Sequence, residues 1–118
     1  MNIKDFSKLV GLSPHTLRYY EKIGLLKSVQ RSQSGHRFYT SRDKEWIDFV
    51  KRLKETGMPL EGILTYAKLR ELGCDTLLER QQLLEQHRAF LSSHIQELEQ
   101  HMLALDDKIA LYQSGKVS

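Results

Sequence analysis

Apolar residues recur every seven positions along the C-terminal part of the chain. One series starts at a leucine and contains Leu84, Leu91, Leu98, Leu105 and Tyr112. The other lies four residues after it and contains Ile95, Met102 and Ile109, with the charged Arg88 at its first position. Such a heptad pattern over residues 84–112 predicts one continuous helix of about 43 Å with a seam that another helix must cover. Because only a short tail follows, we expect the same helix of a second copy to cover it, in a two-fold dimer. The alternative is that the helix packs back on its own N-terminal part.

Charge is distributed unevenly along the chain. Residues 1–70 contain fourteen Lys and Arg against seven Asp and Glu, whereas residues 71–118 contain four against eight. The whole chain therefore carries only +3, but its front part is strongly basic. A basic domain joined to an acidic helix suggests that the front part binds an anionic partner such as nucleic acid.

Composition argues against several classes of protein. No apolar run reaches the ~18 residues of a membrane span, and the N-terminus lacks the apolar core of a signal peptide. We therefore expect a cytoplasmic protein without a membrane partner. The single cysteine, Cys74, forms no internal disulfide and makes no structural zinc site alone. Without a phosphate loop, a metal-ligand cluster or a nucleophile paired with a base, the sequence predicts neither an enzyme nor a cofactor.

Two short helices are predicted at the N-terminus. Apolar spacing places the first over residues 3–10. The second begins with Ser13 as its N-cap and Pro14 at its first position, and it ends at Gly24. Tyr20 belongs to its inward face, and its outward face carries His15, Thr16, Arg18, Tyr19 and Lys22. A helix, a tight turn and a second helix with such a face are typical of proteins that read the major groove of DNA.

A basic hairpin is predicted next, within residues 27–39. Segments with strand-forming residues flank a cluster of Ser, Gln and Gly, which places Ser34 and Gly35 at the tip. Arg31 and Arg37 lie on either side of that tip. A basic hairpin beside a helix-turn-helix unit is a wing that contacts the sugar-phosphate backbone.

Two further helices are expected before the long one. Thr40 and Asp43 have the spacing of a capping box at the start of a helix that ends at Gly57. The next helix starts near Pro59 and is broken within residues 71–76. The order of elements is therefore mainly helical, with one small hairpin.

Residues 16–39 resemble a known family. The segment from Thr16 to Leu26, followed by Arg31 and then by Ser34 to Tyr39, resembles in order and spacing the N-terminal signature of the MerR family of bacterial transcription regulators. The long helix resembles the antiparallel dimerisation coil of that family. Its runs at 85–88 and 105–112 are similar to the small aldehyde- and thiol-responsive branch, the AdhR/NmlR-like proteins, which lack a separate effector domain.

The resemblance implies a fold and a mechanism. The fold is a winged helix-turn-helix domain over residues 1–72, an antiparallel coiled-coil dimerisation helix over 73–112 and a tail over 113–118. Such dimers bind a palindromic operator in a long promoter spacer and distort the double-stranded DNA. RNA polymerase, an indirect partner, then meets both promoter elements in register. The two winged helix-turn-helix domains of such a dimer could reach successive major grooves, which lie about 34–36 Å apart.

The resemblance also assigns DNA-binding roles by position. His15, Thr16, Arg18 and Tyr19 belong to the recognition helix, and the wing supplies Arg31, Ser34, Gly35, His36, Arg37 and Tyr39. The family usually has Tyr at the position of His36. Lys54 and Tyr66 lie where a second wing approaches the backbone, and an ordinary surface role is the alternative for each.

Cys74 is the candidate sensing residue, with an ordinary small-residue role as the alternative. Metal-sensing relatives often place a ligand at the start of the long helix, but they also carry cysteines in a loop after it, which this chain lacks. The aldehyde-responsive branch keeps its cysteine near Lys51 and Arg52 instead. Two other functions stay open: an excisionase-type or architectural DNA-binding protein, against which the heptad seam argues, and a metal-responsive regulator, against which the missing loop argues.

Overall fold

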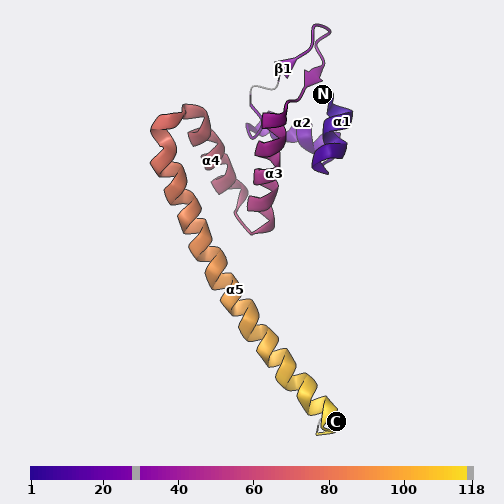
Figure 1. Cartoon of the computed structure of the whole chain (residues 1–118), viewed down its shortest axis with the longest axis vertical. Coiled ribbons are helices and arrows are strands. Elements are labelled where there is room, and N and C mark those ends of the chain that lie inside the picture. Colours follow the sequence, from indigo (N-terminus) through magenta and orange to yellow (C-terminus); the bar gives the residue numbers. More distant parts are fainter. Residues whose placement is uncertain (28–29, 117–118) are drawn as a thin grey trace. The chain divides into compact units, whose positions relative to one another are not determined.

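The structure, a computed structural model, describes residues 1–27 and 30–116 (Figure 1). Contacts group residues 1–81 into one compact unit, and a second unit begins at residue 82. The elements in chain order are α1 (Ile3–Val10), α2 (Pro14–Ile23), β1 (Gln30–Arg31), β2 (Arg37–Phe38), α3 (Ser41–Glu55), α4 (Leu60–Leu72), the 3-10 turn η1 (Cys74–Thr76) and α5 (Leu77–Gln113). The described chain is mainly helical with one short hairpin, which confirms the predicted fold class.

Local capping determines where α2 begins and ends. The Ser13 side chain accepts a hydrogen bond of 3.1 Å from the backbone N–H of Thr16, and Pro14 occupies the first helical position. Gly24 adopts the left-handed conformation with φ of 91°, which a residue with a Cβ rarely takes. The chain therefore leaves α2 sharply, and Leu25 turns into the core, where it is 2% exposed.

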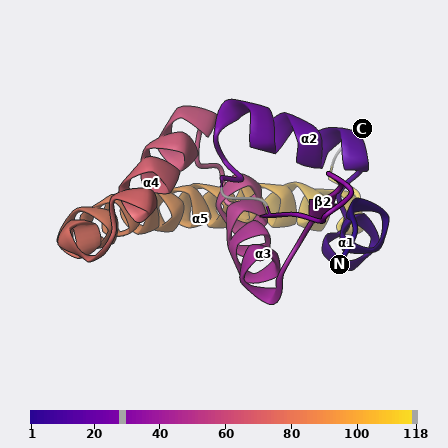
Figure 2. The ribbon, with the colours of Figure 1, turned by 90° about the horizontal axis from the view of Figure 1, so that it is seen from above.

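The core of the first unit lies where α1, α2 and α3 meet. Phe6 of α1 stacks on Tyr39 with ring centroids 4.4 Å apart and planes 5° apart. Met1 and Tyr39 exchange two backbone hydrogen bonds of 2.7 Å, so the start of the chain lies beside the end of β2 (Figure 2). Leu17 of α2 and Ile47 of α3 are fully buried. Packing of α1 thus holds both α2 and the hairpin.

Trp46 connects α3 to the elements on either side of it. Its indole N–H donates a hydrogen bond of 2.6 Å to the carbonyl of Leu25, just beyond the end of α2. The guanidinium of Arg70, from α4, lies 4.4 Å from the centre of the indole ring. The Thr40–Asp43 capping box predicted at the start of α3 is formed in both directions. A buried indole whose N–H is paired is a stable anchor for three segments at once.

The hairpin is short and antiparallel. β1 and β2 pair with Gln30 opposite Phe38 and Arg31 opposite Arg37. Gly35 has a φ of 82° and donates its backbone N–H to the carbonyl of Ser32 at 2.9 Å, which closes the turn. The predicted hairpin is confirmed, although each strand contains only two residues.

The long helix α5 has 37 residues and a length of about 55 Å. Six residues of the predicted seam, Ile95, Leu98, Met102, Leu105, Ile109 and Tyr112, are between 48% and 64% exposed in the single chain. Leu77, one heptad before Leu84, extends the same register to the first residue of the helix. Among the described residues, no helix combines the length and the apolar character that a membrane span requires.

Candidate nucleic-acid interface

The outward face of α2 is largely exposed. His15, Arg18 and Tyr19 are exposed, whereas Leu17 and Tyr20 on the opposite face are buried. Thr16 is half-buried, and its hydroxyl lies 3.0 Å from that of Ser13. The first turn of the helix is therefore rigid, and the exposed Arg and Tyr project from a fixed backbone.

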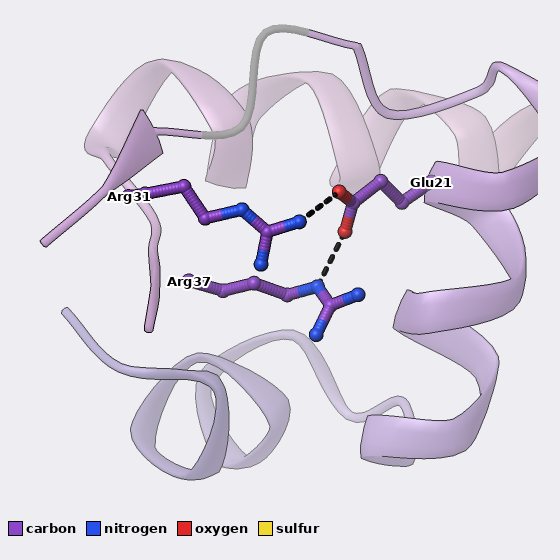
Figure 3. Close-up of polar contacts among 3 residues, drawn as sticks. All are labelled: Glu21, Arg31 and Arg37. Atoms are coloured by element: carbon purple, nitrogen blue, oxygen red, sulfur yellow. Dashed lines mark hydrogen bonds and ion pairs between the residues drawn. The ribbon is translucent and has the colours of Figure 1, made fainter. Parts of the chain in front are cut away.

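Glu21 joins α2 to the hairpin, as Figure 3 shows. One of its carboxylate oxygens accepts from Nη2 of Arg31 at 2.9 Å, and the other accepts from Nε of Arg37 at 2.5 Å. The hydrogen bond to Glu21 raises the pKa of Arg37 above its ordinary value, although burial acts in the opposite direction. The two predicted wing arginines are thus paired with the recognition helix. Sequence reasoning missed Glu21, although it is the single acidic residue of α2.

A cleft of about 440 Å³ opens between the start of α1, the recognition helix and the wing. It is lined by Asn2, Ile3, Arg18, Arg31, Gly35, His36 and Arg37. Arg18, Arg31 and Arg37 thus bring three guanidinium groups to the lining of one cleft, beside the imidazole of His36. Guanidinium N–H groups match the oxygens of a phosphate, so this lining is suited to an anion. The cleft brings together five of the residues that the sequence assigned to DNA binding.

The tip of the wing has its own hydrogen bonds. The hydroxyls of Ser32 and Ser34 lie 2.9 Å apart, and Ser32 donates its backbone N–H to the carbonyl of His36 at 2.7 Å. Ser34, Gly35 and His36 are all exposed. No Cβ at Gly35 would meet another described atom within 4 Å, so its glycine serves the turn rather than a close contact.

Tyr39, predicted to lie at the DNA surface, lies instead in the core. Its side chain is 1% exposed, and its hydroxyl has no hydrogen-bond partner among the described residues. Side chains alternate between the two faces along extended chain, so Phe38 takes the outward position and is 45% exposed. Burial raises the pKa of Tyr39 above its ordinary value, and the charge of Arg37 lowers it by less.

Lys54 and Tyr66, the residues of the expected second wing, lie outside the cleft. Lys54 donates to the hydroxyl of Tyr20 at 3.0 Å, and its ammonium lies 5.5 Å from the centre of that ring. Tyr66 is half-buried and stacks on Trp46 with ring centroids 5.9 Å apart. Lys54 remains exposed and can still meet a phosphate.

Cys74 is a free, exposed thiol in η1. The neighbouring Thr76 is buried, and its hydroxyl donates to the carbonyls of Leu69 and Gly73 and accepts from Nε of Arg80. These bonds fix the turn that carries the cysteine. Within residues 1–27 and 30–116, no group of three or more His, Cys, Asp or Glu side chains is arranged to hold a metal ion.

Two family models match this chain. The model for the MerR HTH family regulatory protein matches residues 1–69, and the model for the MerR DNA-binding region matches residues 45–108. An uncharacterized HTH-type transcriptional regulator of Haemophilus influenzae is 38% identical over 107 residues, which cover 91% of this chain and 79% of that protein. The HTH-type transcriptional regulator AdhR of Bacillus subtilis is 39% identical over 88 residues, which cover 75% of this chain and 63% of that protein.

Solved structures show the same architecture. The crystal structure of HiNmlR, a MerR family regulator lacking the sensor domain, bound to promoter DNA, matches with a TM-score of 0.87 and 36% identity and covers 98% of this chain and 91% of that one. A MerR family transcriptional regulator of Bacillus thuringiensis matches with a TM-score of 0.80 and 30% identity, over 93% of this chain and 96% of that one.

The placement of Tyr39 leads to a test with Tyr39→Phe. Folding raises the pKa of Tyr39 above its ordinary value of 10.0, so the folded chain favours the neutral phenol. The free energy of unfolding is therefore constant with respect to this group below pH 10 and declines as the pH rises from there through the raised pKa. The variant should lose this alkaline decline. Below pH 10 its free energy of unfolding should rise by about 1 kcal/mol, since no unpaired hydroxyl is buried.

Urea unfolding at a fixed protein concentration, once well below and once above pH 10, measures both effects. Tyr19→Phe, which alters an exposed phenol, is the control and should change neither. Weaker DNA binding by Tyr39→Phe with unchanged stability would place Tyr39 back at the interface.

Proposed function

Since the chain belongs to the MerR family of DNA-binding transcription regulators, we propose that it binds a palindromic operator as a homodimer. The observation that carries this proposal is the cleft in which Arg18 of α2, Arg31 of β1 and Arg37 of β2 meet. Groups from the recognition helix and from the wing would thereby bind one anion together. The similarity to HiNmlR, which is bound to promoter DNA, supports double-stranded promoter DNA as the source of that anion.

The two parts of the interface have different tasks in this proposal. The face of α2 enters the major groove, where Arg18 reaches a guanine edge or a phosphate and Tyr19 contacts the backbone. The wing places His36 and Arg37 on the sugar-phosphate backbone beside that groove. Lys54 and Tyr66 remain proposed contacts of a second wing, and Lys54 is the better placed because it is exposed.

The dimer is proposed to form through the seam of α5, including Leu84, Arg88 and Leu91 at its N-terminal end. A row of half-exposed apolar side chains along about 55 Å of helix is costly to leave in water. An antiparallel partner helix would cover the row and place two DNA-binding domains on successive major grooves. In functional terms the chain then divides into residues 1–72, 73–112 and 113–118.

Regulation is proposed to work through the shape of the DNA. The operator would lie in a long promoter spacer, and the dimer would bend and untwist it so that RNA polymerase meets both promoter elements. Such a deformation costs about 1–6 kcal/mol, which contacts made by two domains can supply. The inducing signal is proposed to be an aldehyde, another electrophile or a thiol oxidant, with exposed Cys74 as the residue that reacts.

Arg18→Gln tests the recognition helix. On a duplex selected by the wild-type protein from a random-sequence pool, we expect affinity to fall about tenfold or more, because a bidentate base contact contributes about 1–3 kcal/mol. Fluorescence anisotropy at one salt concentration measures it. Lys116→Gln removes the same charge far along the chain and should bind normally. Equal affinities of wild type and Arg18→Gln would contradict the assigned role.

Leu98→Glu tests the seam against a matched control on the same helix. Leu98 and Leu103 are similarly exposed, at 50% and 57%, but only Leu98 lies on the heptad positions. A buried carboxylate should disrupt the dimer, so Leu98→Glu should sediment as a monomer and bind the selected duplex much more weakly. Leu103→Glu should remain dimeric. Two dimeric variants would contradict the proposed interface.

Cys74→Ser tests the signal. In cells carrying a reporter under the operator promoter, the wild type should respond to formaldehyde or diamide, and the serine variant should lose that response while its DNA affinity stays unchanged. Serine keeps the size of the side chain but is far less nucleophilic. An unaltered response to both compounds would exclude Cys74 as the sensor.

A further inference from the structure

Glu21 is an acidic residue in a surface that otherwise attracts anions. It is the single acid of α2, and its carboxylate pairs with two of the three arginines that line the cleft. The three guanidinium groups and the carboxylate together carry +2 instead of +3. Because like charges repel, Glu21 weakens the attraction of the cleft for any phosphate.

The same carboxylate removes a conflict within the wing. Arg31 and Arg37 lie directly opposite each other in the hairpin register, and like charges in that position destabilise a strand pair. Strands of two residues have little stability of their own to set against this repulsion. The Glu21 carboxylate bridges the two guanidinium groups: each of its oxygens accepts a hydrogen bond from one of them (Figure 3).

The pairing also leaves both arginines able to bind DNA. Arg37 donates only Nε–H to Glu21, and Arg31 donates only through Nη2. A guanidinium has five N–H donors, so further donors of each group remain for the cleft. The side chains of Glu21 and Arg37 are 23% and 28% exposed, so water screens this pair less than the surface pair Lys44–Asp48, at 39% and 46%.

Glu21 therefore links the wing arginines directly to the recognition helix. It shares α2 with Arg18, so the wing arginines are held in a fixed relation to the side chain that reads the bases. We propose that Glu21 is a specificity-determining positioning residue, which lowers affinity for DNA of any sequence and directs the wing to the backbone only where α2 has found its site. This inference rests on the proposed DNA-binding function.

The test compares Glu21→Gln with the wild-type protein on two duplexes. One is the duplex that the wild type selects from a random pool, and the other is a shuffled sequence of the same composition. Loss of the negative charge should tighten binding to the shuffled duplex about threefold. The slope of the logarithm of the binding constant against the logarithm of the salt concentration should become steeper by up to about 0.9. The ratio of the two affinities should fall about fivefold, because the wing arginines are no longer held.

Two further variants separate charge from position. Glu21→Asp keeps the charge but shortens the side chain, so it should bind the shuffled duplex like the wild type and still lose part of the affinity ratio. Asp48→Asn removes a carboxylate of another ion pair, on the exposed surface of α3, and should change neither the ratio nor the salt dependence. Circular dichroism checks that each variant keeps its helices.

The outcomes are distinct. An equal loss of affinity for both duplexes in Glu21→Gln would show that Glu21 only supports the fold, and a ratio as high as that of the wild type in both Glu21 variants would overturn the proposal. A wild-type protein that does not distinguish the two duplexes would instead contradict the proposed function, and this inference with it.

Discussion

The stack of Phe6 on Tyr39 is the contact on which the DNA-binding unit depends. A hairpin with two-residue strands does not persist in water without support. Here the end of β2 is held by that stack and by the two backbone hydrogen bonds between Met1 and Tyr39. The N-terminal helix therefore supports the wing, although the two are separated in sequence by the whole recognition helix.

The hairpin has a second support at the cleft, on the side proposed to meet DNA. Glu21 holds Arg31 and Arg37, so the hairpin is anchored by apolar stacking beneath and by a charged pair above. The two supports differ chemically. Arg31 and Arg37 also line the cleft, so their remaining N–H donors can bind a phosphate there. A unit built in this way has a rigid base and an adaptable contact surface.

The long helix α5 is stabilised in a different way. An isolated helix is only marginally stable, and most helical stability comes from packing of an apolar face. The exposed row on α5 provides such a face, so the stability of this part of the molecule should depend on protein concentration. If the seam forms the proposed dimer, association of two chains and folding of the long helix are coupled.

Much of the fold could be predicted because its determinants are local. The caps at Ser13 and Thr40 join atoms three residues apart, and the heptads of α5 follow from helical geometry alone. The exposed face of α2 and the Ser34–Gly35 tip were predictable for the same reason. The domain boundaries, the assigned DNA contacts and the role of Cys74 remain proposals.

Tertiary packing decided what local rules left open. Whether Phe38 or Tyr39 points inward depends on which face of the hairpin meets Phe6, and a two-residue strand shows no alternation from which to read it. The pairing of Glu21 joins groups ten and sixteen positions apart on different elements, so no spacing rule reveals it. The sequence by itself determined the elements and their ends, because those are set by neighbouring residues. Only the folded chain determined which charges meet, because that requires distant segments to pack together.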